Sequence, residues 1–209
     1  MSNHILTPFH SGFIPGDSSV YQLLSLYDYI CRYLDNGVTT QAIFFIYISK
    51  AFDKVWHRGL VSKLETIAVR GGLLNWFKNY SAGRRQAVVI KWCRSDYTDV
   101  SARAPQGPVL GPLLFLIYIN DIVIDIELVI QIFADDTSLY LCLHNDDACA
   151  EILNSHLEKI SVWATTWKIT FNNIKAELRK ISWKREPQPL PLNFENVVFK
   201  DRENQKILV

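Results

Sequence analysis

The spacing of apolar residues predicts several helices separated by short strands. From residue 20 to residue 34, apolar side chains recur at steps of three and four, which predicts an amphipathic helix. Ser18 or Ser19 can cap the start of this helix, and Asn36-Gly37 ends it. Comparable patterns predict further helices over 58–69, 73–80 and 146–167, and the apolar run over 109–119 predicts a buried helix that starts at a proline.

The helix predicted over 146–167 has a clear start and a clear apolar face. Asn145 supplies a cap, and Asp146 and Asp147 place negative charge at the positive end of the helix dipole. The inward face is expected to hold Ile152, Leu153, Leu157, Ile160, Trp163 and Trp167.

Short apolar runs predict the strands. Ala42–Ile48 is almost unbroken in its apolar character, as expected of a buried central strand. Two β-prone runs flank Asp135 and Asp136, and they predict a hairpin over 130–142 with the acidic pair at its tip. We therefore expect an α+β domain in which this strand and this hairpin lie side by side. A further strand pair is expected over Gln86–Trp92 and Tyr97–Ser101.

A proline-rich stretch marks the expected end of the domain. Three prolines occur between Pro187 and Pro191, a composition typical of a linker. We expect one domain over 1–183, followed by a Pro-rich linker and C-terminal remnant over 184–209. The last fifteen residues are expected to pair as a strand or to stay loose.

Charge and composition narrow the classes of partner. A chain of 209 residues, 49% of them apolar, is long enough to bury a sizeable core. It carries 22 basic and 21 acidic side chains, so it lacks the basic excess that is typical of nucleic-acid-binding domains. Any polyanionic partner must therefore be held by local groups.

The cysteines and the apolar segments favour an intracellular protein. The four cysteines show no C-x-x-C spacing, so we expect reduced thiols and no disulfide-linked partner. The first residues lack the basic start and apolar run of a signal peptide. The longest apolar stretch, 109–119, is broken by Gly111-Pro112 and is too short to span a bilayer. We expect no membrane partner and a location in the nucleus or cytoplasm.

The adjacent carboxylates of Asp135 and Asp136 are the first candidate site. Two carboxylates at a hairpin tip repel each other unless a cation lies beside them, and Mg²⁺ suits this position because it prefers oxygen ligands. The alternative is a polar turn without a ligand, since Asp is a favoured turn residue.

Five stretches, taken together, resemble one family. They are residues 11–16, 46–57, 104–112, 167–172 and the Phe133-Ala134-Asp135-Asp136 motif. In this order and spacing they closely resemble the reverse transcriptase domain of non-LTR retrotransposons, over residues 8 to about 183. The resemblance implies a right-hand polymerase palm, with antiparallel central strands packed on helices, plus partial fingers. It implies an RNA template, a DNA primer and dNTPs as partners and substrates.

The resemblance also implies a nucleotidyl transfer that uses two Mg²⁺ ions held by three aspartates. Asp135 and Asp136 match the pair at the hairpin. Phe52 matches the aromatic residue that lies under the incoming sugar and rejects a 2′-hydroxyl. The alternative for Phe52 is a core aromatic.

Three further residues match functional residues of the family. Gln106 and Gly107 match the turn that contacts the template–primer, although Gln106 can also be a capping residue. Lys175 matches a lysine suited to protonating or neutralising the pyrophosphate leaving group. Its alternative is a solvated surface charge.

The third aspartate of the family is absent, because Tyr47 stands at its position. A phenol with a pKa near 10 is neutral at pH 7, has one oxygen where a carboxylate has two, and is larger. Loss of a bridging metal ligand is expected to cost several kcal/mol of transition-state stabilisation, on the order of 10³-fold in rate. Asp53 is a possible replacement, but it lies six residues further on, past the end of the strand.

Other departures point the same way. Ile14 and Asp17 stand where the family has arginines facing the triphosphate, and a carboxylate repels that group. Arg103-Ala104 replaces the usual Gly-Val, and Pro108 replaces a common Ser. The sequence therefore predicts an inactive or severely impaired reverse transcriptase. The alternatives are a catalytically dead remnant that binds nucleic acid or protein, and a metal-dependent hydrolase that would need a further carboxylate or His near the acidic pair.

Overall fold

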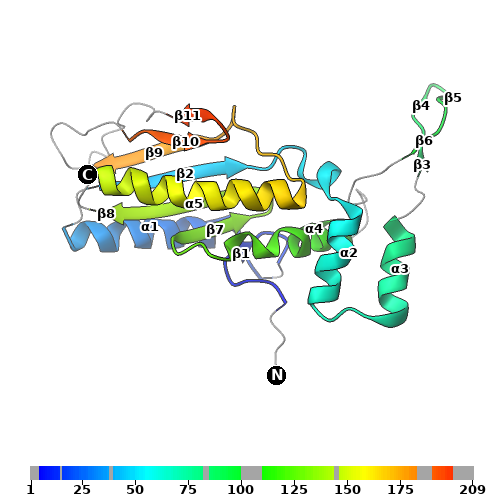
Figure 1. The fold of residues 1–209 in the computed structure, drawn as a ribbon, viewed down its shortest axis with the longest axis horizontal. Coiled ribbons are helices and arrows are strands. Elements are labelled where there is room, and N and C mark those ends of the chain that lie inside the picture. Colours follow the sequence, from blue (N-terminus) through cyan, green and yellow to red (C-terminus); the bar gives the residue numbers. More distant parts are fainter. Residues whose placement is uncertain are drawn as a thin grey trace.

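The fold is built on a five-stranded sheet. A computed structural model describes residues 5–14, 16–37, 40–81, 85–99, 110–143, 146–182 and 190–199. The strand order is β1-β7-β8-β2-β9, and β1 is parallel to β7 while the other pairs are antiparallel (Figure 1). The strands are β1 (His10–Ser11), β2 (Thr40–Tyr47), β7 (Val129–Phe133), β8 (Asp136–Leu143) and β9 (Glu177–Ser182).

The strand β2 lies in the interior of the sheet, as predicted. It pairs with β8 over its whole length and with β9 from Thr40 to Phe45. The side chains of Ala42, Phe44 and Ile46 are fully buried. The apolar run therefore predicted both the strand and its burial, and the predicted α+β class is confirmed.

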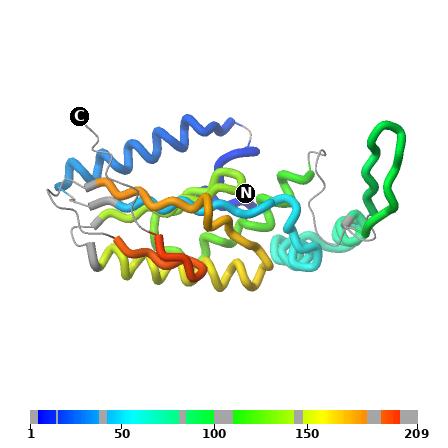
Figure 2. Tube along the Cα trace, turned by 90° about the horizontal axis from the view of Figure 1, so that it is seen from above, coloured from blue at the N-terminus to red at the C-terminus, as the bar shows by residue number. Residues whose placement is uncertain are grey.

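The helices α1 (Ser19–Asp35) and α5 (Asp146–Trp167) cover opposite faces of the sheet (Figure 2). The start of α1 is capped by Ser18, whose Oγ accepts a hydrogen bond from the backbone N–H of Tyr21 at 3.4 Å. Its end lies at Asn36, followed by Gly37 in the left-handed region at φ 76°. The cap and stop residues predicted for α1 are thus confirmed.

The apolar face of α1 is not part of the core. None of its residues is buried, and its apolar side chains Val20, Leu23, Leu24 and Tyr27 are more than half exposed. A ring contact between Tyr29 and Tyr140 of β8 attaches the helix to the sheet. The spacing correctly predicted a helix, but spacing alone does not reveal whether another element covers the face.

The helix α5 packs into the core through Leu153, Leu157 and Ile160, which are fully buried. The prediction was wrong for Ile152, which is 36% exposed. Because Leu153 follows directly and points to the sheet, its neighbour is turned by about 100° toward solvent.

The remaining helices form a second group beside the sheet (Figure 1). The helix α2 packs against α3 and α4, and α4 is apolar on all sides and almost wholly buried. The proline start predicted for α4 falls on residues 108 and 109, which lie outside the described residues. The bounds are α2 (His57–Thr66), α3 (Gly71–Ser81), α4 (Leu110–Ile119), and the 3₁₀ turns η1 (Ala51–Lys54) and η2 (Asn120–Val123).

A hairpin over residues 85–99 projects from this helical group (Figures 1 and 2). The strand predicted over Gln86–Trp92 was too long, because Lys91 and Trp92 adopt positive φ angles and turn the chain back. Ser101, at the end of the predicted partner strand, lies outside the described residues. The hairpin consists of β3 (Arg85–Gln86) paired with β6 (Thr98–Asp99) and β4 (Val89–Ile90) paired with β5 (Cys93–Arg94).

The C-terminal hairpin shares the core of the sheet. It comprises β10 (Leu192–Phe194) and β11 (Val197–Phe199). The rings of Phe194 and Phe199 lie 5.9 and 5.1 Å from that of Phe44 on β2. Residues 190–199 therefore pack on the sheet, while the predicted domain boundary at 183/184 falls among residues 183–189, outside the described part. In the described part of the chain, every helix is too short or too polar to cross a membrane.

Candidate active site

A pocket of about 400 Å³ opens where β2 ends. It brings together side chains that are far apart in the sequence and were predicted to share a site: Tyr47, Phe52, Asp135, Asp136 and Lys175. Two other predicted site residues, Gln106 and Gly107, lie outside the described residues.

The acidic pair lies where the tight turn between β7 and β8 meets the start of β8. Phe133 pairs with Asp136, so Ala134 and Asp135 are the two turn residues. Ala134 has φ 55°, a left-handed conformation that costs a non-glycine residue about 1–2 kcal/mol. Its backbone N–H donates to the carbonyl of Ser11 at 3.1 Å, so β1 supports the turn in this conformation.

Gly12 permits this close approach of β1 to the turn. Gly12 has φ 78°, and a Cβ on it would meet the backbone nitrogen of Ala134 at 3.3 Å. A larger residue here would therefore move the turn that carries the acidic pair.

The sheet places Tyr47 directly beside the acidic pair. Tyr47 and Asp136 are register partners across β2 and β8, and such partners have Cβ atoms about 4.5–5.5 Å apart on the same face of the sheet. The next residue, Ile48, donates its backbone N–H to the carbonyl of Asp135 at 3.2 Å. The predicted placement of position 47 next to the two carboxylates is confirmed.

The pocket holds Tyr47 neutral. Partial burial raises the pKa of the Tyr47 phenol, and the nearby charges of Asp136 and Glu177 raise it further, against a weaker opposing effect of Arg179. Tyr47 is therefore a neutral hydroxyl at pH 7. It offers the pocket a hydrogen-bonding group without the charge that a third carboxylate would supply.

The carboxyl of Asp136 resists ionisation. Loss of hydration raises the pKa of Asp136 to about 6, the charge of Asp135 adds to this, and the Lys175 ammonium opposes it. Because the residue as a whole remains exposed, solvent screens part of the shift. A cation in the pocket would relieve the repulsion between the two carboxylates.

Lys175 reaches the pocket on a turn that is tied to β2. The backbone N–H of Asn172 donates to the carbonyl of Tyr47 at 2.7 Å, and Lys175 donates its own N–H to the carbonyl of Asn172 at 3.0 Å. The Lys175 side chain is exposed, and its charge acts on Asp136. Sequence reasoning did not single out Asn172 for this positioning role.

Phe52 has one side in the core and one side on the pocket. It sits on η1, and its ring lies 5.0 Å from Phe115 and 6.2 Å from Phe13. It also lines the pocket and is only partly buried. The core and pocket interpretations are therefore compatible. Asp53, on the same short turn, lines the pocket as well.

Two side chains of β9 next to the site were missed by sequence reasoning. Glu177 pairs with Phe45 in the sheet register, and its Oε2 accepts from Nη2 of Arg179 at 2.8 Å. The alternation of apolar and polar residues over 176–179 was the available signal.

The donor set fits a divalent cation only in part. Asp135 and Asp136 are adjacent oxygen ligands of the kind that Mg²⁺ prefers. Among the residues that the structure describes, however, no group of three or more His, Cys, Asp or Glu side chains is placed to hold a metal ion. Beside Asp136, Tyr47 contributes a phenol to the pocket and no carboxylate.

Comparison with known proteins identifies the family. The family described as "Reverse transcriptase (RNA-dependent DNA polymerase)" matches residues 2–194. The chain belongs to the reverse transcriptase family. Its curated relatives are polymerases of non-LTR retrotransposons, as the sequence motifs indicated.

Relatives from fruit flies show how much of a longer protein this reverse transcriptase chain covers. It is 34% identical to the "Probable RNA-directed DNA polymerase from transposon X-element" of Drosophila melanogaster, over 92% of this chain and 22% of that protein. It is 29% identical to the corresponding protein "from transposon BS" of the same species, over 100% of this chain and 24% of the relative. It is 30% identical to the "RNA-directed DNA polymerase from mobile element jockey" of Drosophila funebris, over 61% of this chain and 15% of the relative. The chain therefore spans less than a quarter of the length of these relatives.

Proposed function

We propose that this chain is the palm and partial fingers of a non-LTR reverse transcriptase whose nucleotidyl-transfer site is severely impaired. The observation that carries the proposal is the pairing of Tyr47 with Asp136 inside the pocket. It supports a polymerase site because strand β2 and the acidic hairpin meet there. It supports impairment because one of three expected carboxylates is a phenol.

Four side chains that line the pocket have a role in this proposal. Asp135 and Asp136 would hold divalent metal, which supplies positive charge to stabilise the transferring phosphoryl group when it is bound. Lys175 would protonate or neutralise the pyrophosphate leaving group. Phe52 would pack under the sugar of the incoming dNTP and exclude a 2′-hydroxyl.

The substitution at position 47 weakens this arrangement in two ways. First, the neutral phenol removes one negative charge from the ligand set, so divalent cations bind more weakly. Second, the aromatic ring lines the pocket and takes up space beside the two carboxylates. We expect a loss of rate on the order of 10³-fold.

A second candidate is a folded remnant that binds nucleic acid or protein without catalysis. It is favoured by the apolar core, which is continuous from β2 through α4 and α5 to β10 and β11. Packing of this kind does not depend on the residue at position 47. The chain can therefore keep its fold and its surfaces without polymerising DNA.

Primer extension distinguishes the two candidates. The unmodified chain and Tyr47→Asp are assayed on an RNA template with a DNA primer, dNTPs and Mg²⁺, with Tyr47→Asn as a matched control of similar size to the aspartate. We expect no detectable extension by the unmodified chain or by Tyr47→Asn, and extension by Tyr47→Asp that disappears when Asp135→Asn is added. Extension by the unmodified chain that depends on Asp135 would contradict the impaired site.

Metal binding supplies a readout that does not need catalysis. Titration calorimetry with Mn²⁺ should show about tenfold tighter binding to Tyr47→Asp than to the unmodified chain, because a third carboxylate joins the donor set. Equal affinity of the two proteins would show that position 47 is not part of a metal site.

A further inference from the structure

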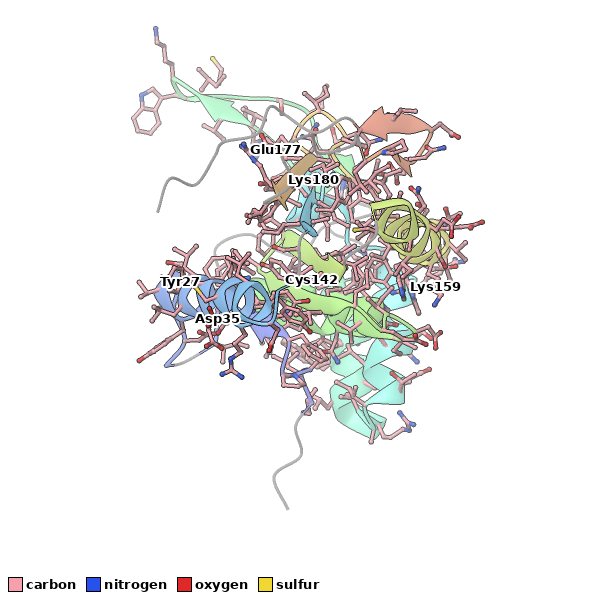
Figure 3. All side chains as sticks on the ribbon, turned by 90° about the vertical axis from the view of Figure 1, so that its left-hand side faces the viewer. Tyr27, Asp35, Cys142, Lys159, Glu177 and Lys180 are labelled. Carbon is pink, nitrogen blue, oxygen red and sulfur yellow. The ribbon has the colours of Figure 1, made fainter. Side chains whose placement is uncertain are left out.

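A second groove, of about 770 Å³, shares no lining residue with the catalytic pocket. Its walls are the segment from Asp121 to Glu127 and the outer turns of α5 from Ser155 to Trp163. The side chain of Lys159, which lines it, lies on the opposite side of the sheet from α1 (Figure 3). A ligand in this groove would leave the pocket at Tyr47 open.

The groove has an apolar surface that faces solvent. Ile124 and Val162 line it, and each is 63% exposed. Trp163, which is only partly buried, forms part of the same wall. Apolar side chains that line a concave surface are typical of ligand and peptide sites, because their burial stabilises the complex.

The charges around this apolar surface are mostly negative. Four carboxylates line the groove, those of Asp121, Asp125, Glu127 and Glu158. Lys159 is the single basic residue among the lining residues, and its Nζ donates to the backbone carbonyl of Asp125 at 2.9 Å. The groove therefore attracts cationic groups and repels the phosphates of nucleic acid.

The deep wall of the groove is held rigid before any ligand arrives. Oδ1 of Asp121 accepts hydrogen bonds from Nζ of Lys63 at 2.5 Å and from Nε1 of Trp163 at 2.9 Å. The Lys63 ammonium, almost wholly buried, lies 3.8 Å from the ring centre of Trp167. A ligand therefore pays little entropy to order this wall.

We propose that this groove binds a basic peptide segment of a partner protein, in which Arg or Lys side chains alternate with apolar ones. The apolar side chains would cover Ile124 and Val162, and the basic ones would meet Asp125, Glu127 and Glu158. Charge complementarity selects this partner over RNA or DNA. The groove is independent of polymerisation, so the proposal holds whether or not the catalytic pocket is active.

Fluorescence anisotropy with a labelled nonapeptide of alternating Arg and Leu tests the proposal. The double variant Asp125→Asn with Glu158→Gln should bind about fivefold to tenfold more weakly than the unmodified chain, because each exposed charge pair contributes a few tenths to about 1 kcal/mol. The matched control is Glu151→Gln, which neutralises an exposed carboxylate on α5 outside the groove. It should change the affinity for the peptide by less than about twofold. Equal losses in the control and the double variant would overturn the proposal.

Val162→Arg tests the groove at a second place, because it changes both the apolar wall and the charge of the groove. Because Val162 is exposed, the substitution should leave the circular dichroism spectrum and the unfolding midpoint unchanged. Peptide binding should be lost, since the new side chain places a positive charge in the groove. Unchanged binding by Val162→Arg would overturn the proposal.

Amide shifts in a two-dimensional NMR spectrum should locate the peptide. Shifts confined to residues 121–127 and 155–163 support the groove. Peptide-induced shifts that map to the catalytic pocket would overturn the proposal. It would also be overturned if a single-stranded RNA of equal length displaced the peptide and shifted the same amides.

Discussion

Asp121 and Asp136 stand in contrasting environments, one in the groove along α5 and the other in the pocket at the end of β2. Asp121 accepts hydrogen bonds from Lys63 and Trp163. These two bonds tie α2 and α5 to the end of α4. Asp136 faces a second carboxylate and a neutral phenol, and burial and Asp135 raise its pKa to about 6. The fold supplies the Asp121 carboxylate with two hydrogen-bond donors, whereas the surroundings of Asp136 oppose ionisation of its carboxyl. A carboxylate whose ionisation destabilises the folded chain is typical of a site that binds a cation or a substrate.

The largest effect should follow from breaking the Asp121 pair. Lys63→Met keeps much of the side-chain volume but removes the ammonium, so Asp121 loses its counter-charge. We expect a loss of about 3 kcal/mol in the free energy of unfolding, measured by urea denaturation. Lys159→Met, at an exposed lysine on α5, should cost less than about 0.5 kcal/mol. Similar losses in both variants would show that the Lys63–Asp121 pair contributes no more to stability than an exposed lysine does.

His10 presents a buried titratable group that has neither a partner like that of Asp121 nor the solvent access of Asp136. Both ring nitrogens are buried without a hydrogen-bond partner among the described residues, and burial lowers the pKa of His10 from 6.5 to about 4. The unfolded chain therefore takes up a proton at a higher pH than the folded chain.

It follows that the contribution of neutral His10 to the free energy of unfolding is complete above pH 6.5. This contribution is lost progressively as the pH falls toward 4. The expected loss of unfolding free energy over this window is on the order of 3 kcal/mol. Urea titrations at pH 7 and pH 4.5 should show a smaller difference in His10→Phe than in the unmodified chain. An equal difference would assign the acid sensitivity to other groups.

Neutralising each aspartate should change stability in opposite directions. At pH 7, Asp121→Asn should destabilise the chain by about 1–2 kcal/mol, because Lys63 is left buried without an anion. Asp136→Asn should stabilise it by a few tenths of a kcal/mol, the repulsion from Asp135 being screened by solvent.

The pH dependence gives the same contrast an independent check. Because its pKa is raised, the Asp136 carboxyl does not reduce the free energy of unfolding below its ordinary pKa of 3.8. The reduction develops as the pH rises from 3.8 to about 6. Thermal melts at pH 4 and pH 7 should therefore show that Asp136→Asn raises the midpoint only at pH 7. A rise of the same size at both pH values would exclude ionisation as the cause.

The smallest effect should come from adding a cation. Millimolar Mg²⁺ is expected to raise the melting midpoint by about 1 °C, because two carboxylates alone bind it weakly. The rise should be absent in Asp135→Asn and larger in Tyr47→Asp. A rise that persists in Asp135→Asn would place the bound cation elsewhere.

Sequence patterns located the elements of the site better than they located its surroundings. The apolar run of β2 and the acidic pair are local signals, and each predicted its element directly. By contrast, α1 satisfied the same helical spacing as α5 yet has no buried residue. Burial depends on what covers a helix, and that is not encoded in the helix itself.

The sequence by itself determined the family, the strand that contains Tyr47 and the hairpin that carries Asp135 and Asp136, because these rest on residue types at short spacings. The family resemblance also placed position 47 beside the acidic pair, but only the tertiary structure decided that its register partner is Asp136, 89 positions away, and that Lys63 meets Asp121 across 58 positions. Contacts over such separations depend on how strands register and how helices pack, and local patterns do not specify either.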